Sequence, residues 1–295
     1  MVAEDKVKVA TSKPEAGLYI VATPIGNLKD ITLRALETLR GVDAIACEDT
    51  RVTNRLLSHY GIKASMVAYN DANGAKVRPQ LLRRLAEGQS LALVSDAGTP
   101  LISDPGYKLV REAREQGSHI TTLPGASSVM GALTLAGLPT NRFLFEGFLP
   151  AKQQARTEAL RAISNVDATL VFFERASRVP VVLADMLEVL GDREVALVRE
   201  ITKSFEETVH GQLSGLIARY GKGEEIRGEV VLVLAPPSEA TQARAGDAVL
   251  DERLAVLLRE YSVKDVAALA AEEFGIHRKQ AYQRALEIKG GHAQR

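Results

Sequence analysis

Short apolar runs rich in β-branched residues alternate along the chain with segments in which apolar residues recur every three or four positions. The runs cover residues 18–22, 44–47, 90–95, 119–123, 169–173, 194–198 and 229–235. Such runs predict strands, and the periodic segments between them predict amphipathic helices. Because the runs are apolar at nearly every position, the strands are expected to be buried on both faces of a sheet. The pattern therefore predicts the α/β class.

Two stretches interrupt this rhythm and divide the chain. Residues 136–156 carry two prolines and are predicted to link two α/β units, and residues 235–247, rich in Pro, Ala, Ser and Gly, form a second connector. Only helical patterns follow this second connector. We expect a disordered tail over residues 1–16, an N-terminal α/β domain over 17–137, a second α/β domain over 138–236 and a helical region over 248–295.

Composition and charge limit the kinds of ligand, metal site and cellular location that the chain is expected to have. Lys plus Arg and Asp plus Glu number 37 each among 295 residues, so any nucleic-acid surface must be a local patch. The single cysteine, Cys47, is expected in the core and excludes an intramolecular disulfide, which fits a cytoplasmic protein. No apolar run approaches membrane-spanning length, and the N-terminus lacks a secretory signal. The five histidines are scattered without metal-ligand spacing, so we expect no metal site.

The first turn-rich loop, TPIGN at residues 23–27, directly follows a predicted strand. It fits neither the dinucleotide fingerprint nor the phosphate-binding P-loop, because it has one glycine and Pro24 lacks an N–H group. By spacing alone the loop is a tight turn before a helix that Asp30 or Thr32 caps.

Two further loops also follow strands. In SDAGTPLISDPG (95–106), Asp96 lies nearest the strand end, where open α/β sheets bind ligands, and it is placed to accept hydrogen bonds from a hydroxyl or amine. The alternative is that Asp96 and Asp104 are turn residues. In LPGASS (123–128), Ser127 or Ser128 begins an apolar helix. Plain helix capping and a ligand at the free N–H groups account for this serine pair equally well.

Charged residues collect after three other predicted strands. These residues are Glu48, Asp49 and Arg51; Glu174, Arg175 and Arg178; and Arg199, Glu200, Lys203, Glu206 and Glu207. Such clusters are usually solvated surfaces or salt-bridge networks, but their position at strand ends favours a site.

The C-terminal segment has a helix, a glycine turn and a second helix, which is the helix-turn-helix layout. Ser262 is expected to cap the first helix and Gly275 to end it. The residues expected to face inward are Val266, Leu269, Ala270, Ala281, Leu286 and Ile288. From residue 276 onward five Lys or Arg residues stand against one acid. Contact with RNA and simple packing explain this basic segment equally well.

The loops and strands carry a series of motifs whose order along the chain identifies a family. These motifs are TPIGNLKDIT, EDTR, DAGTPLISDPG, LPGASS, FEGFLPAK, FFERASR, REITKSFEE and GEVVLVL. The chain resembles, from about residue 18 to its end, the ribosomal RNA small-subunit (cytidine-2′-O-)-methyltransferase I family. That family belongs to the tetrapyrrole-methylase superfamily, the class III methyltransferases that use S-adenosylmethionine (SAM). The resemblance implies two α/β domains with SAM in the cleft between them, a homodimer, and methylation of a cytidine ribose in the decoding region of the small-subunit RNA.

The resemblance also implies site residues by position. Those expected to hold SAM are Pro24, Ile25, Gly26, Asp96, Thr99, Pro100, Ser127, Ser128, Phe173, Val198, Gly228, Glu229 and Val230. One departure is Ser177, where the family often has a histidine, so no histidine is assigned as general base there.

Methyl transfer from a sulfonium requires positioning and removal of the acceptor proton, but no metal or covalent nucleophile. We therefore expect Glu48, Asp49 and Lys203 to be the catalytic groups. The residues expected to contact RNA are Arg51, Arg178, Arg199, Arg278, Lys279 and Arg284. The expected substrate is the small-subunit RNA or the assembled subunit. Methylation of a tetrapyrrole, and RNA binding without catalysis, are the alternatives.

Overall fold

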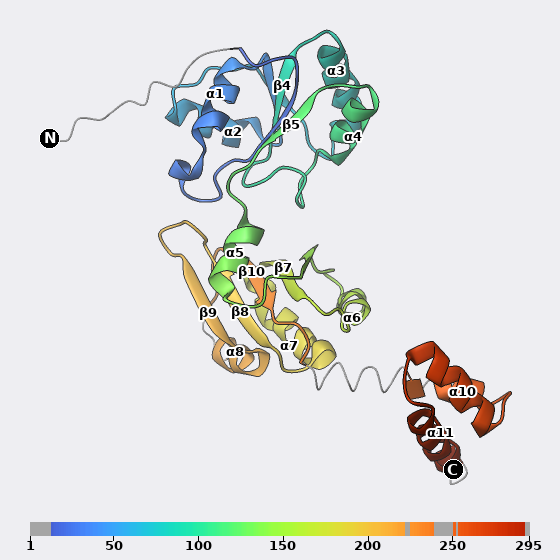
Figure 1. The fold of residues 1–295 in the computed structure, drawn as a ribbon. Coiled ribbons are helices and arrows are strands. Elements are labelled where there is room, and N and C mark those ends of the chain that lie inside the picture. Colours follow the sequence, from blue (N-terminus) through green and yellow to red (C-terminus); the bar gives the residue numbers. More distant parts are fainter. Residues whose placement is uncertain (1–12, 222–224, 239–249, 252, 293–295) are drawn as a thin grey trace.

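The computed structural model describes residues 13–221, 225–238, 250–251 and 253–292. Two α/β layers, each built on one sheet and stacked one above the other in the view of Figure 1, contain most of these residues, and a helical C-terminal region lies apart from both. Among the described residues, no helix is long and apolar enough to cross a membrane.

The first sheet is parallel throughout and has the strand order β3-β2-β4-β1-β5. Its strands are β1 (Gly17–Val21), β2 (Ala44–Cys47), β3 (Met66–Ala68), β4 (Ser90–Val94) and β5 (Ile120–Leu123). Its helices are the 3₁₀ turn η1 (Leu28–Asp30), α1 (Leu33–Gly41), α2 (Thr50–His59), α3 (Gly74–Ala86) and α4 (Tyr107–Glu115). The apolar faces of α1 and α2 cover one side of the sheet, and those of α3 and α4 cover the other. Alternate strand residues enter the two cores, as the continuous apolar runs predicted.

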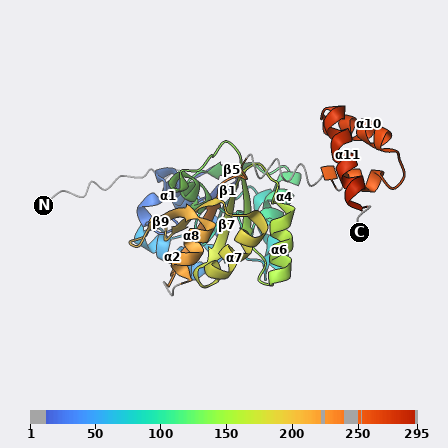
Figure 2. The same ribbon diagram turned by 90° about the horizontal axis from the view of Figure 1, so that it is seen from below.

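The second sheet is mixed and has the order β6-β7-β10-β8-β9, with only β6 and β7 parallel. Its strands are β6 (Phe143–Phe148), β7 (Thr169–Arg175), β8 (Glu194–Arg199), β9 (Glu207–Gln212) and β10 (Glu229–Leu234). Helices α6 (Gln153–Ala162), α7 (Val179–Leu190) and α8 (Leu213–Tyr220) pack on one face, and the 3₁₀ turn η2 (Ala176–Arg178) precedes α7. Figure 2 shows the two layers from below, with α6, α7 and α8 nearest the viewer.

Helix α5 (Ser128–Ala136) covers the opposite face of this second sheet, where its buried residues pack on β8 and β10. The predicted domain boundary after residue 137 assigns α5 to the first domain, and this boundary stays a prediction. In the structure α5 packs on the second sheet. The sequence predicted a linker over residues 136–156, but this segment also contains the edge strand β6. A bulge and partial exposure break the strand pattern there. Strands β3 and β9, which are short or polar, were also not predicted.

The helical region has a core of its own. It contains helical residues 250–251 and 253–257, α10 (Val263–Phe274) and α11 (Arg278–His292). Ser262 caps α10 and Gly275 ends it in a left-handed conformation, as predicted. Two predictions are wrong, because Leu269 and Leu286 are 41% and 47% exposed. The small residues Ala267, Ala270, Ala281 and Ala285 occupy the helix contact instead, since they allow the helices to approach closely.

Candidate active site

A cavity of about 350 Å³ lies between the loops of the first sheet and the ends of β7 and β10 in the second. Its walls are largely apolar side chains and backbone, with a few polar groups, which is typical of a small-molecule site. The lining residues are Ala97, Gly98, Thr99, Ile102, Ser103, Asp104, Ser127, Ser128, Val129, Phe148, Phe173, Glu174, Arg175, Ala176, Gly228, Glu229, Val230 and Val231.

The loop after β1 is joined to the loop after β4. Thr23 and Gly98 exchange two backbone hydrogen bonds, with N–O distances of 2.9 and 3.0 Å. A side chain at Gly98 would meet Ile25, and the φ of +80° at Gly98 also favours glycine. Ile25 thus lies against Gly98, which lines the cavity.

The same first loop touches the second domain. The backbone N–H of Asn27 donates to Oγ1 of Thr202 at 3.1 Å. A Cβ atom at Gly26 would lie only 2.4 Å from Cγ of Lys203, so this close approach requires glycine. The glycine of TPIGN therefore lets two loops meet, and it cradles no phosphate.

Unusual backbone conformations concentrate in two loops beside the cavity. Among the described residues, the non-glycine residues with positive φ are Leu101, Ser103, Glu200 and Thr202. Such conformations cost on the order of 1–3 kcal/mol each and cluster at functional sites. Their location supports the assignment of this cavity as the site.

The structure brings together only part of the residues expected to hold SAM. Those that line the cavity are Thr99, Ser127, Ser128, Phe173, Gly228, Glu229 and Val230. Those that are not among the lining residues are Pro24, Ile25, Gly26, Asp96, Pro100 and Val198. Val198 is fully buried under α5, because its position on β8 points it into that core. Ser127, rather than Ser128, is the N-cap of α5 and accepts a hydrogen bond from the backbone of Met130.

An acidic hollow adjoins the cavity through the loop that follows β4. Glu48, Asp49, Asp71 and Asp96 line this hollow together with Asn70 and neighbouring backbone. Burial and the negative charges of Asp96 and Asp104 raise the pKa of Glu48. Burial also raises the pKa values of Asp96 and Asp104. The backbone N–H of Asp49 donates to Oδ1 of Asp96 at 3.0 Å, which ties the end of β2 to this loop.

Glu48 and Asp49 have opposite electrostatic surroundings. The hydrogen bonds from the Arg51 side chain and backbone lower the pKa of Asp49 to about 2, and Asp49 also caps α2. A carboxylate with so low a pKa is a weak proton acceptor, whereas a raised pKa suits a general base. Of the two, Glu48 has the properties of a base, and Asp49 holds Arg51 at the rim of the hollow.

Lys203 is bound by two carboxylates. Its Nζ atom lies 2.9 Å from Oε1 of Glu200 and 3.0 Å from Oε2 of Glu229. Burial lowers the pKa of Lys203, but the hydrogen bonds to Glu200 and Glu229 outweigh it and the pKa is raised. Lys203 is therefore positively charged beside the cavity. This charge disfavours Lys203 as a general base, because only a neutral amine can accept a proton.

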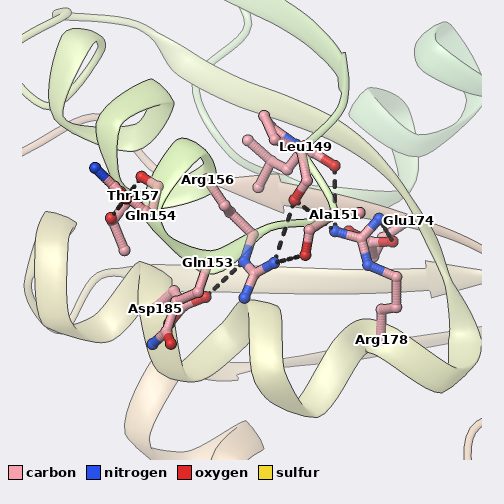
Figure 3. Close-up of polar contacts among 10 residues, drawn as sticks. Leu149, Ala151, Gln153, Gln154, Arg156, Thr157, Glu174, Arg178 and Asp185 are labelled. Carbon is pink, nitrogen blue, oxygen red and sulfur yellow. Dashed lines mark hydrogen bonds and ion pairs between the residues drawn. The ribbon is translucent and has the colours of Figure 1, made fainter.

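Arg178 and Arg199 make bonds within the protein. Nη2 of Arg178 donates to the backbone carbonyls of Leu149 (3.1 Å) and Pro150 (3.0 Å), and Nη1 lies 3.4 Å from the buried carboxylate of Glu174 (Figure 3). Nε of Arg199 donates to Glu207 at 2.6 Å. These bonds give both residues a supporting role in the second domain, and their contact with RNA stays a prediction.

The remaining residues expected to contact RNA lie on the helical region. Arg278, Lys279 and Arg284 border a shallow hollow at the start of α11 with His277 and Gln280. Arg278 and Lys279 are exposed, whereas Arg284 forms a two-pronged ion pair with Asp251 at 2.6 and 2.8 Å. The start of α11 thus presents Arg278 and Lys279 to solvent, and Arg284 ties α11 to the segment that contains Asp251.

Several cavity residues were not predicted as site residues. Asp104 lies at the far end of the second loop, where the sequence left a turn residue and a ligand contact as alternatives. Phe148 lies at the end of the unpredicted strand β6. The motif FEGFLPAK was a signal for this strand, since its glycine marks a bulge between apolar residues.

Comparisons with known proteins agree with the two-layer architecture. The family model for tetrapyrrole (corrin/porphyrin) methylases matches residues 17–217, and that for the RsmI C-terminal HTH domain matches residues 244–289. A solved structure of uroporphyrin-III C-methyltransferase from Thermus thermophilus, complexed with S-adenyl homocysteine, has a TM-score of 0.52 at 19% identity, covering 74% of this chain and 97% of that chain.

Curated relatives are similar over nearly the whole chain. The ribosomal RNA small subunit methyltransferase I of Mesorhizobium japonicum is 46% identical over 276 residues, covering 93% of each chain. The protein of the same name from Escherichia coli O157:H7 is 49% identical over 276 residues, covering 92% of this chain and 96% of the relative.

Proposed function

Because the chain belongs to the tetrapyrrole (corrin/porphyrin) methylase family, we propose that it methylates small-subunit (16S) ribosomal RNA with SAM as the methyl donor. The acceptor in this proposal is the ribose 2′-hydroxyl of a cytidine in the decoding region. The observation that carries the proposal is the extent of the similarity to the ribosomal RNA methyltransferases, which includes the helical region as well as both sheets.

The cavity has the chemistry that a sulfonium nucleoside requires. SAM, when bound, supplies an electrophilic methyl group on a cationic sulfur. Phe173, Val129 and Val230 offer an apolar surface for an adenine ring, and Asp104 offers a carboxylate to a cation or a hydroxyl. The backbone of Gly98 and Gly228 allows close approach, because neither residue has a side chain. The volume lies within the usual range for small-molecule sites.

Glu48 is the proposed general base. A ribose hydroxyl is a weak acid, and burial beside Asp96 and Asp104 makes the Glu48 carboxylate hold a proton more strongly than an exposed one. Lys203, held cationic by Glu200 and Glu229, is proposed to orient these two carboxylates at the wall of the cavity. Arg51 has a side chain that is 87% exposed at the rim, where it is placed to contact the phosphates that flank the acceptor.

The helical region is proposed to bind RNA through Arg278 and Lys279. Lysine and arginine contacts to phosphates give affinity without sequence specificity and weaken with salt. We further propose a homodimer that acts in the cytoplasm, on free small-subunit RNA or on the assembled subunit.

A transfer assay with methyl-labelled SAM tests the proposal. Small-subunit RNA, the assembled small subunit and a corrin precursor are offered separately to the enzyme. We expect label in the RNA or the subunit, and label in the corrin precursor alone would contradict the proposal. Glu48→Gln should reduce the single-turnover rate at least 100-fold, since general bases typically contribute 10²–10⁴-fold. Asp71→Asn, in the same hollow, serves as the matched control.

A further inference from the structure

Phe148 occupies an unusual position for a large apolar residue. It lies on the wall of the cavity, yet its side chain is 56% exposed. Its ring centroid lies 5.6 Å from that of Phe173 in an edge-to-face arrangement, and Phe173 contacts Phe145 in the same manner at 4.8 Å. The three rings form a row in which Phe145 and Phe173 pack against the core below α5 and Phe148 stands at the opening.

A bulge in β6 directs the ring to this side of the sheet. Phe145 pairs with Val171, Gly147 with Phe172 and Phe148 with Phe173, so Glu146 is the extra residue. Without the bulge, Phe145 and Phe148 would face opposite sides, because side chains alternate along a strand. Gly147 has φ of +68°, which favours glycine and fits the bulge. The local backbone thus brings Phe148 to the cavity face.

Two arginines hold the segment that follows Phe148. Arg178 donates to the carbonyls of Leu149 and Pro150, and Arg156 donates to those of Pro150 (3.2 Å) and Ala151 (2.9 Å). Figure 3 shows both guanidinium groups reaching this segment. The Arg156 side chain is 4% exposed and is paired with Asp185 at 2.5 Å. Buried ion pairs are weak sources of stability, so this arrangement is better explained by the geometry that it fixes.

We propose that the Phe148 ring is a stacking platform for the nucleobase of the acceptor nucleotide. This inference rests on the proposed RNA methyltransferase function and names the contact that positions its substrate. Enzymes that bind single-stranded or flipped-out nucleotides stack bases on exposed aromatic rings. Phe173, the deeper of the two lining rings, is placed to contact the donor within the cavity. The exposed ring at the opening remains available to the nucleotide whose ribose must reach the methyl group.

The test combines a protein change with an RNA change. Methyl transfer is measured for wild type, Phe148→Ala and Phe148→Tyr on a small-subunit RNA that carries cytidine at the mapped acceptor position. A second RNA carries an abasic ribose at that position, which keeps the 2′-hydroxyl but removes the base. Phe143→Ala is the matched control, because Phe143 is an exposed phenylalanine on the same strand that does not line the cavity.

Phe148→Ala should lower kcat/KM about tenfold or more on the cytidine RNA, as expected for loss of one stacked base. Phe148→Tyr and Phe143→Ala should stay within about threefold of wild type. On the abasic RNA, Phe148→Ala should cause little further loss, because the stacking partner is already absent. The SAM Kd and the oligomeric state should be unchanged in Phe148→Ala.

Three results would overturn the inference. An equal loss on both RNAs would show that the ring does not act on the base. A weaker SAM Kd in Phe148→Ala would assign the ring to the donor, and a changed oligomeric state would assign it to a second copy of the chain. If the wild type transfers no methyl group to small-subunit RNA, the proposed function fails and this inference fails with it.

Discussion

An alanine side chain at Gly228 should distort the cavity wall, which Gly228 helps to form. Its φ is +88°, and a Cβ atom there would lie 2.3 Å from Oε1 of Glu200, well inside contact distance. Glu200 cannot easily move away, because its Oε1 accepts hydrogen bonds from the backbone of Glu229 (3.0 Å) and from Lys203 (2.9 Å). Gly228→Ala must therefore break these bonds or displace the cavity wall.

The size of the effect follows from two contributions. A left-handed conformation costs a residue with a side chain about 1–2 kcal/mol. Loss of a hydrogen bond to a charged group adds about 1.5–3 kcal/mol. We expect Gly228→Ala to lower the free energy of unfolding by about 2.5–5 kcal/mol. Gly137→Ala, the control, should lower it by about 1–2 kcal/mol, because Gly137 has φ of +62° but nothing within 4 Å of an added Cβ.

Calorimetry with SAM distinguishes the two variants functionally. Displacing the wall formed by Gly228, Glu229 and Val230 by about 1 Å should weaken SAM binding at least tenfold, since misplacements of this size cost up to about 100-fold in rate. Gly137→Ala should bind SAM within twofold of wild type. If the two variants bind SAM equally well, the wall around Gly228 does not contact the donor.

Three other perturbations test separate parts of the account. Arg156→Met should lower the free energy of unfolding by about 3–5 kcal/mol in urea denaturation followed by circular dichroism, because it leaves Asp185 buried without its partner, and adding Asp185→Leu should recover part of this loss. Burial raises the pKa of Asp104, so its ionisation opposes folding, and its contribution to stability is fully present below the ordinary value of 3.8 and is lost as the pH rises through the raised value. The Tm of Asp104→Asn relative to wild type should therefore increase between pH 4 and pH 7, and a constant difference would contradict this assignment. Truncation after residue 245 should leave SAM binding intact and weaken methylation of the small subunit, whereas equal activity would indicate that the helical region only packs.

Much of the fold follows from local sequence patterns. Continuous apolar runs predicted the central strands of both sheets, because each of those strands is buried on two faces. The signals at Ser262 and Gly275 gave correct helix ends, and Ser127 is the one of the two candidate serines that caps α5, since caps depend on nearby backbone. The strands that were missed, β3, β6 and β9, are short, polar or bulged, and each lies at the edge of its sheet, where it pairs with a single neighbouring strand.

The site was harder to predict because its geometry depends on contacts between distant loops. Motif position identified Thr99, the Ser127–Ser128 pair and the Gly228 segment as lining residues. It could not show that Gly26 faces Lys203 instead of the cavity, or that Arg178 is bonded to the carbonyls of Leu149 and Pro150. Nor could it separate Glu48 from Asp49, because the pKa of Glu48 is raised by burial and by Asp96 and Asp104, which only the folded chain brings near it.

Methylation of a cytidine ribose in small-subunit RNA can be measured directly. Mass spectrometry maps 2′-O-methyl groups along small-subunit RNA after incubation with SAM in the presence and absence of the enzyme. We expect one additional methyl group, on the 2′-oxygen of a cytidine in the decoding region, that is absent with Glu48→Gln. A methyl group on a base, or no enzyme-dependent methyl group in RNA that was unmodified at the start, would contradict it.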